Sequence, residues 1–360
     1  MLESASFITI AMLFMKLIRI QDIRTLMTHI NIKDFLKNLS EILMEDFSHW
    51  GEFQKSARYA AYVDNGVLEL MPVCGPKLFS FKYVNGHPNN PKSNRLNIVA
   101  LGMLANVETG YPLMLSEMTL LTALRTAATS ALASKLMARK NSKKLAIIGC
   151  GAQSEFQVLA HHALFDLTEV HYFDLDPTAM DRFAGHLSKE SFKLIAAPNA
   201  KTAIDGVDLI VTATAARSKT KVIEKTWLTP GQHISGIGGD SPGKTELDPA
   251  ILDIAKIAVE YFPQTHHEGE IQNLGDAAKS RVYAELWELC NHSKKGRDND
   301  SEITLFDDVG FALEDYSILR YVYQLAEQFN IGLTPDLIPE DMPDPKNLFG
   351  LLHPTCAPSN

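Results

Sequence analysis

The segment KLAIIGCGAQS, residues 144–154, is the most informative part of this chain. An apolar, β-branched run ends there in two glycines, and a helical pattern begins at once. Such a turn directs backbone N–H groups and the positive end of a helix at an anion. Gly149 would form the tight turn and Gly151 would admit a pyrophosphate, while Ser154 replaces the usual third glycine. The pattern predicts a dinucleotide-binding turn, with a ligand-free strand-to-helix turn as the alternative.

An acidic residue follows at the end of the next predicted strand. Asp174 ends the run EVHYFD and lies 25 residues after Gly149. That spacing is close to the ~20 residues typical of the acid that binds the adenosine ribose hydroxyls. Because a carboxylate would repel a 2′-phosphate, the sequence predicts NAD rather than NADP.

The segments around this turn predict an α/β fold. Short buried runs such as DLIVTATA, QHISGIGG and KIAVEYF alternate with helical or loop segments, which is typical of a Rossmann-type, doubly wound parallel sheet. Before them, runs such as GVLELMPV and KLFSFKYV between residues 57 and 116 predict an antiparallel or mixed sheet. Residues 32–50 and 119–137 have helical patterns, and the second helix would connect two domains.

The composition excludes several classes of protein. A chain of 360 residues suits two domains, and 46% hydrophobic with 21% charged residues is ordinary for a globular protein. A net charge of −9 argues against a partner such as nucleic acid or an anionic membrane. Four widely spaced cysteines predict a reducing, cytoplasmic location. The apolar run at residues 7–15 is too short to span a membrane and has no basic residue before it, so no targeting segment is expected.

Charged residues interrupt the apolar runs of the first half. Lys82 lies in a predicted strand and Arg125 in an Ala- and Leu-rich helix. A buried charge needs a partner, and with Arg58 these cations would form a carboxylate-binding cluster. Glu69 would suit an ammonium, although strand alternation also allows it to face solvent.

A second polar group follows the predicted strand QHISGIGG. Asp240 and Lys244 belong to GGDSPGK, just past the carboxyl end of that strand, where doubly wound folds place their chemistry. Asp240 would accept and return protons on an amine substrate, with an aspartate that caps a turn as the alternative. The adjacent histidines at 161–162 and 266–267 lack the spacing of metal ligands, so no metal is expected.

Five segments then resemble a known family. They are ELMP from Glu69, FKYVNGHP from Phe81, SEMTLLTALRTAATSA from Ser116, IIGCGAQSEF from Ile147 and GGDSPGKTEL from Gly238. From about residue 15 to 349 the chain resembles the ornithine cyclodeaminase/mu-crystallin family, and residues 1–14 lie outside the likeness. The resemblance implies a homodimer, with a substrate-binding and dimerisation domain (15–130 with 325–360) and a Rossmann NAD-binding domain (131–324). It also implies conversion of L-ornithine to L-proline and ammonia through internal hydride transfer to and from NAD.

The resemblance assigns roles to single residues, with Asp240 as general acid/base. The substrate positions are Arg58, Lys82, Arg125 and Val309. The positions that contact NAD are Ala152, Gln153, Asp174, Thr214, Ile234, Ser235, Gly236, Ile237 and Lys244. Two further positions near the dinucleotide depart from the family, since Asn97 replaces Thr and Asp308 replaces Ser. An acid there would need a neighbouring cation such as Lys244.

Three alternative activities stay open. An amino-acid dehydrogenase or ketimine reductase would release or consume NADH, and Glu69 argues against it because such relatives tend to have an apolar residue there. A lysine cyclodeaminase would take a substrate one methylene longer, a difference worth only ~1–3 kcal/mol. A binding protein similar to mu-crystallin would leave Lys82, Arg125 and Asp240 without a use.

Overall fold

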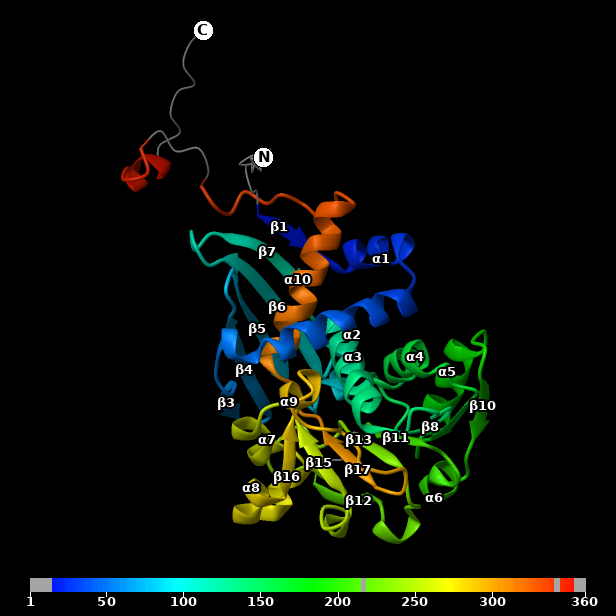
Figure 1. The fold of residues 1–360 in the computed structure, drawn as a ribbon. Coiled ribbons are helices and arrows are strands. Elements are labelled where there is room, and N and C mark those ends of the chain that lie inside the picture. The colour runs from blue at the N-terminus through cyan, green and yellow to red at the C-terminus, as the bar shows by residue number, and fades with distance from the viewer. Residues whose placement is uncertain (1–14, 215–217, 340–343, 353–360) are drawn as a thin grey trace, which may run out of the picture.

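The computed structural model describes residues 15–214, 218–339 and 344–352. The expectations for residues 1–14 and for Cys356 lie outside these ranges. The described chain forms a mixed sheet with four helices and a parallel sheet with further helices (Figure 1). None of the helices in these ranges is long and apolar enough to cross a membrane.

The first half of the chain builds a mixed sheet. Its strands are β1 (Lys16–Ile18), β2 (Gln54–Lys55), β3 (Tyr59–Val63), β4 (Gly66–Cys74), β5 (Leu78–Gly86), β6 (Ile98–Asn106) and β7 (Pro112–Glu117). The order is β1-β7-β6-β5-β4-β2, with β3 also paired to β4, and β1 is parallel to β7 while the other pairs are antiparallel. The sequence prediction of an antiparallel or mixed sheet is therefore confirmed.

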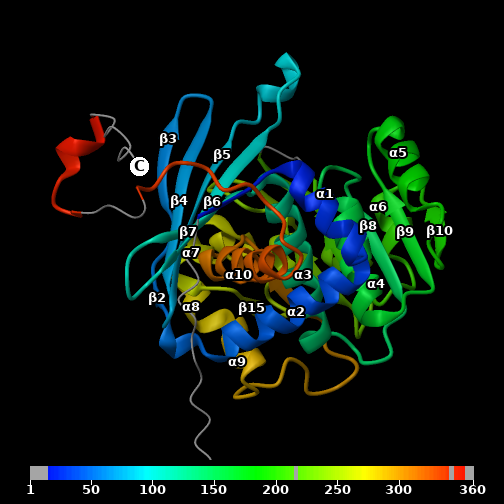
Figure 2. The same cartoon turned by 90° about the horizontal axis from the view of Figure 1, so that it is seen from above.

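One face of this sheet packs on helices. The helices of this half are α1 (Ile20–His29), α2 (Ile32–Ser48), α3 (Thr119–Met137) and α10 (Ala312–Gln328). Seen from above, α10 runs beside the sheet and α3 and α2 lie next to it (Figure 2). On this inner face Met71, Lys82 and Gly102 stand opposite one another on β4, β5 and β6, and all three are buried.

The remaining strands form the predicted parallel sheet, which confirms the α/β, Rossmann-type fold. They are β8 (Lys144–Ile148), β9 (Glu169–Phe173), β10 (Lys193–Ala196), β11 (Leu209–Thr212), β13 (His233–Gly236), β15 (Lys256–Val259), β16 (Val282–Glu285) and β17 (Thr304–Asp307). The order is β10-β9-β8-β11-β13-β17-β15-β16, and every pair is parallel. A separate pair joins β12 (Lys219–Ile223) to β14 (Thr245–Leu247).

Both faces of the parallel sheet are buried, which explains its continuous apolar strands. Leu145 and Ile147 enter one apolar core, and Ala146 and Ile148 enter another. The helices of this half are α4 (Ser154–Phe165), α5 (Pro177–Leu187), α6 (Ala200–Ile204), α7 (Phe262–Glu268), α8 (Ala278–Arg281) and α9 (Leu286–Cys290). From β8 the chain proceeds to β9 and β10 on one side and returns to β11 on the other. This reversal creates a crevice at the carboxyl ends of β8 and β11, where such folds bind ligands.

α3 and α10 connect the two halves. α3 spans the predicted residues 119–137 and packs against both α2 and α4. α10 packs on α2, α3 and β5, and beyond it Leu333 pairs with Leu17 of β1. Because the whole of α10 lies on the first half, we propose that the tail joins the first domain near Phe311 rather than at residue 325.

Candidate active site

The turn after β8 has the geometry that a dinucleotide requires. Gly149 has a φ of 101°, and a Cβ there would lie 2.6 Å from the carbonyl oxygen of Ala213, so the fold itself needs glycine. A Cβ at Gly151 would meet no atom of the described residues within 4 Å, so the second glycine leaves open space beside the backbone. α4 begins at Ser154, and its positive end lies at this turn.

Two polar groups beside the turn favour a ligand there. Asp174 follows β9, and its carboxylate accepts from the backbone N–H groups of Cys150 at 2.7 Å and Asp176 at 2.9 Å. Gln153 precedes α4, and its buried side-chain oxygen has no hydrogen-bond partner among the described residues. The open glycine, the helix N-terminus, the fixed carboxylate and the unpartnered oxygen together fit a dinucleotide such as NAD.

The neighbouring strands bring the stretch 234–237 to the same crevice. Ile148, Thr212 and Gly236 are aligned across β8, β11 and β13, so the residues that follow them leave the sheet side by side. The residue after Gly236 is Ile237, which is 8% exposed at this edge. The side chains of Ile234 and Ser235 are fully buried within β13 and do not reach the crevice.

Three other residues implied to contact NAD have different surroundings. Thr214, just past β11, donates its backbone N–H to the buried Glu246 at 2.7 Å. Ala152 is exposed in the turn itself. Asn97 is exposed in the connection between β5 and β6, where its carbonyl accepts from the backbone N–H of His87 at 2.9 Å.

The cations Lys82 and Arg125 meet at the inner face of the mixed sheet. Lys82 Nζ lies 2.9 Å from Asp315 Oδ1, and Arg125 Nε lies 3.1 Å from the same oxygen. Arg125 Nη1 also donates to Glu314 Oε2 at 2.6 Å. Both acids belong to the first turn of α10, where the helix dipole favours negative charge. Sequence reasoning missed these acids, although the adjacent pair in FALEDYS was a signal for a helix start.

Arg58 adds a third cation to this cluster. Its Nη2 donates to the carbonyl oxygens of Val309 and Gly310, both at 2.7 Å, and its Nη1 donates to Glu69 at 3.2 Å. Its Nε lies 3.3 Å from Glu268 Oε2. The Val309 carbonyl therefore fixes Arg58, and the contact of Val309 with the substrate stays a prediction.

The solvent-facing alternative for Glu69 is wrong. Only 12% of its side chain is exposed, and it pairs with Arg58. On β4 it has the same side as the buried Met71, whereas Leu70 points outward and is 40% exposed. Side chains on β4 do alternate between the two faces as expected, but Glu69 lies on the inner face and its neighbour Leu70 on the outer one.

Asp240 and Lys244 follow the carboxyl end of β13 and pair with each other. Lys244 Nζ donates to Asp240 Oδ1 at 2.9 Å, and 44% of the Asp240 side chain is exposed. Two residues further, Pro242 lines a hollow of about 390 Å³ together with Arg58 and Glu268. Asp240 thus has a partner and an open approach, as a proton-transfer group requires.

Asp308 corrects an expectation of the sequence analysis. Lys244 does not neutralise it, because Lys244 pairs with Asp240. Asp308 is 2% exposed, and burial together with the nearby carboxylates of Glu260 and Glu314 raises its pKa well above the usual range. Burial therefore favours the protonated carboxyl, and the nearby cation that opposes this shift is Arg125 rather than Lys244.

Three functional residues, one just past β15 and two in α7, were missed by sequence reasoning. Glu260 accepts from the backbone N–H groups of Val309 at 2.7 Å and Gly310 at 2.6 Å. Gln264 donates to the Gly310 carbonyl at 2.7 Å, and Glu268 faces Arg58. In the segment HHEGE the sequence analysis considered only the histidines as possible ligands. The functional residue is its first glutamate, Glu268, which pairs with Arg58.

The pKa of Lys82 leads to the first testable prediction. Burial, together with the nearby Arg125, lowers the pKa of this ammonium to about 8. Lys82 is charged below that pH and neutral above it, so the cluster should bind a carboxylate more weakly as the pH rises. Pentanoate, whose charge is constant above pH 6, should therefore lose affinity by up to about tenfold per unit above pH 8.

The Lys82→Arg variant is the matched comparison for this titration. Arginine keeps its charge to far higher pH, so the variant should hold pentanoate with nearly constant affinity between pH 8 and 10. The dissociation constant of pentanoate is measured across this pH range for both proteins. The same pH dependence in both would contradict the prediction.

The fold and the site define a class of protein. A Rossmann-type sheet with a dinucleotide turn adjoins a second sheet that buries three cations, and residues of both line one hollow, near which Asp240 offers a carboxylate suited to proton transfer. This combination is typical of enzymes that transfer a hydride to or from a small carboxylate-bearing substrate.

The chain belongs to the ornithine cyclodeaminase/mu-crystallin family, which residues 21–330 match. It is 46% identical over 335 residues to an ornithine cyclodeaminase of Agrobacterium fabrum, covering 93% of this chain and 94% of that protein. A lysine cyclodeaminase studied for its recognition of L-lysine, L-ornithine and L-2,4-diaminobutyric acid superposes with a TM-score of 0.84 at 28% identity, over 92% of this chain and 98% of the other. An archaeal alanine dehydrogenase dimer with bound NAD superposes with a TM-score of 0.82 at 32% identity, over 90% and 99%. The family resemblance found in the sequence is therefore confirmed.

Proposed function

We propose that this protein is an NAD-dependent ornithine cyclodeaminase, an ammonia lyase that converts L-ornithine to L-proline and ammonia. The observation that carries the proposal is the cluster of Lys82, Arg125 and Arg58 with Glu69, in which Arg58 lines a hollow that Pro242, two residues past Asp240, also lines. The family assignment and the similarity to an ornithine cyclodeaminase over nearly the whole chain support it.

Each of these residues has its own role in the proposed reaction. When bound, NAD supplies a hydride acceptor that also serves as the donor for the later reduction. The substrate carboxylate is bound by the three cations Lys82, Arg125 and Arg58, which orient Cα. Because these side chains are buried, water is kept from the imine that forms when Cα gives up its hydride. Asp240 takes a proton from the substrate amine and returns it when ammonia leaves. Glu69 binds the distal ammonium before it loses its proton and attacks.

The test is an incubation of the protein with ornithine and NAD. Proline and ammonia should form in equal amounts with no net absorbance of NADH, because the hydride returns within each turnover. Accumulation of NADH in step with substrate loss would indicate a dehydrogenase, and faster turnover of lysine would indicate a lysine cyclodeaminase. Binding of NAD and ornithine without formation of any product would indicate a non-catalytic binding protein similar to mu-crystallin. NADP should replace NAD poorly, because Asp174 is expected to bind the ribose hydroxyls and its carboxylate would repel a 2′-phosphate.

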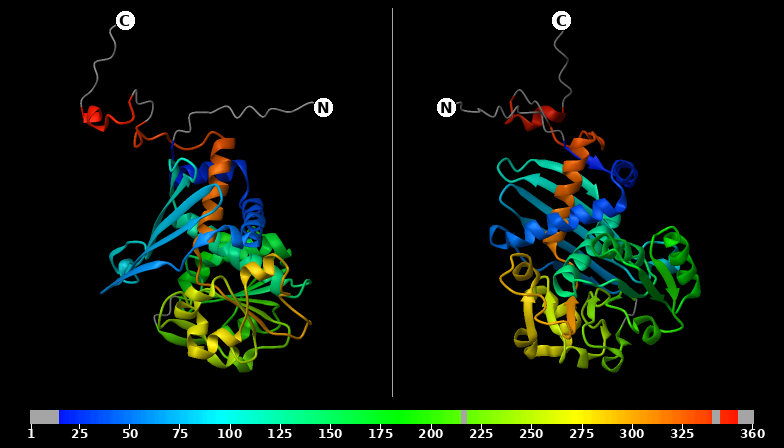
Figure 3. Two further views of the ribbon diagram at one scale, coloured as in Figure 1. Left: turned by 60° about the vertical axis from the view of Figure 1, so that its left-hand side comes forward. Right: turned by 45° about the vertical axis from the view of Figure 1, so that its right-hand side comes forward.

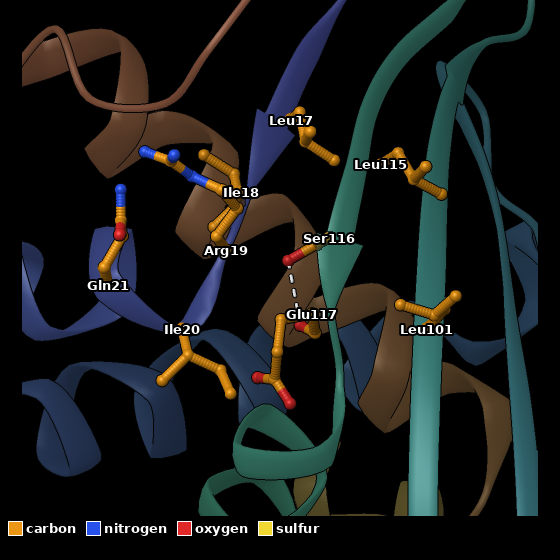
Figure 4. Close-up of a pocket in the computed structure, with 9 residues that line it drawn as sticks. All are labelled: Leu17, Ile18, Arg19, Ile20, Gln21, Leu101, Leu115, Ser116 and Glu117. Carbon is orange, nitrogen blue, oxygen red and sulfur yellow. Dashed lines mark hydrogen bonds between the residues drawn. The ribbon is translucent and has the colours of Figure 1, made fainter.

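A homodimer is the second part of the proposal. Figure 3 shows the mixed sheet with its helices on one face. On the other face, one row of exposed apolar residues crosses four strands. The row consists of Tyr59 at 70%, Leu70 at 40%, Tyr83 at 40% and Leu101 at 50% exposure. A hollow of about 400 Å³ continues the row at the edge of the sheet, where Leu17, Leu115 and Leu101 come from three neighbouring strands (Figure 4). Such a contiguous apolar patch marks a protein interface.

Sedimentation measures this part directly. The wild-type protein should be a dimer, and Leu101→Asp should shift it toward the monomer by placing a charge in the interface. Ile254→Asp, at a similarly exposed site on the cofactor domain, should remain dimeric. A monomeric wild type would overturn the proposal.

A cytoplasmic location is the last part of the proposal. Cys74, Cys150 and Cys290 are free thiols, which suits a reducing compartment. Cell fractionation of the native host tests this, and recovery from the periplasm would contradict it.

A further inference from the structure

Every nitrogen of the Arg58 guanidinium already faces a partner in this structure. Nη1 is held by Glu69, Nη2 by two backbone carbonyls, and Nε faces Glu268 at 3.3 Å. The Arg58, Glu69 and Glu268 side chains are only 8%, 12% and 7% exposed, so water does not replace these contacts. A substrate carboxylate therefore reaches Arg58 only if it displaces one of the two glutamates.

Glu268 is the more easily displaced of the two. Its Oε2 and Arg58 Nε are both buried without a hydrogen-bond partner among the described residues, so the pair is close but poorly aligned. Glu69, by contrast, accepts a hydrogen bond from Arg58 with each of its oxygens. Glu268 also ends α7, where the helix dipole disfavours a negative charge.

The surroundings of Glu268 favour a cation. The side chain lines the hollow that Arg58, Tyr62 and Pro242 also line. Burial and the nearby carboxylates of Glu69 and Asp240 raise its pKa to about 7, although Arg58 opposes the shift. Two glutamates share one guanidinium here, so a second positive charge would relieve their repulsion.

We infer that Glu268 forms, with Glu69, the binding site for the distal ammonium of a diamino acid, and that substrate binding exchanges ion pairs. The substrate carboxylate takes the place of Glu268 on Arg58, and the released Glu268 takes the distal ammonium. In this exchange every buried charge keeps a partner. A substrate without a distal amine would displace Glu268 from Arg58 and leave this glutamate without a cation, so it would bind more weakly. This inference rests on the proposed function, since it assigns the specificity of the same site.

The test compares ornithine with norvaline, which has the same carbon chain but no distal amine. Dissociation constants are measured by calorimetry in the Asp240→Asn background, where turnover is slowed, with and without Glu268→Gln. Glu268→Gln should weaken ornithine binding by tenfold or more. It should leave norvaline binding unchanged or tighter, because the competitor for Arg58 has lost its charge. Glu69→Gln should also lower the preference for ornithine.

The outcomes separate this inference from the proposed function. If Glu268→Gln leaves the preference for ornithine over norvaline intact in this background, Glu268 has no such role, while the cyclodeaminase stands. Equal weakening of both ligands would show a merely structural role and would also overturn the inference. If the protein with Glu268 intact does not prefer ornithine, the proposed function itself fails. Glu224→Gln, at an exposed site on the cofactor domain, is the control and should change neither constant.

Discussion

Asp240→Asn should lower the turnover of ornithine by ~100-fold or more while NAD binds with nearly unchanged affinity, the scale expected for a lost acid/base group. The carboxylate stands just past the carboxyl end of β13 and is held by Lys244 at 2.9 Å, with 44% of the side chain exposed toward the crevice. Asparagine has the same shape but cannot accept and return a proton. Steady-state formation of proline and calorimetric titration with NAD measure the two effects separately.

A matched variant and a contrary result define the limits of this prediction. Asp253→Asn replaces an exposed aspartate of the same domain and should retain full turnover. Near-normal activity of Asp240→Asn would reject the acid/base assignment. A parallel loss of NAD affinity would instead mean that the Asp240–Lys244 pair holds the cofactor site together.

The two glycines of the turn should respond in opposite ways to alanine. Gly149→Ala should destabilise the protein by about 1–3 kcal/mol, because its left-handed backbone is strained for alanine and the new Cβ meets the Ala213 carbonyl at 2.6 Å. Gly151→Ala should leave the free energy of unfolding nearly unchanged, since no described atom lies within 4 Å of the new Cβ. It should nevertheless weaken NAD by tenfold or more, because the methyl group occupies the path of the pyrophosphate.

Urea unfolding without NAD and calorimetry with NAD distinguish these two effects. Gly185→Ala, within α5 and with the same open space around its Cβ, is the control and should leave NAD affinity intact. If Gly151→Ala binds NAD normally, the dinucleotide does not lie against this turn. If Gly149→Ala unfolds like the wild type, the strain at the turn is not what requires a glycine.

Much of the fold follows from local pattern. The buried run before Gly149 and the strand-to-helix alternation after it predicted the parallel sheet, because strands covered on both faces must be apolar throughout. The Ala- and Leu-rich segment predicted α3 to the residue, because its helix propensity is high along its whole length. The extent of α10 and its domain were less predictable, since they depend on packing against α2, α3 and β5.

For the site, the sequence was enough to indicate which charged side chains are buried, since Lys82 and Arg125 lie within apolar segments. Their partners came from packing alone. Asp315 lies 233 residues from Lys82, and Glu314 lies 189 residues from Arg125. The same holds for Glu268, whose position against Arg58 depends on how α7 meets the mixed sheet. Periodicity records whether a side chain is buried, but the identity of its neighbour depends on contacts between distant segments that no local pattern contains.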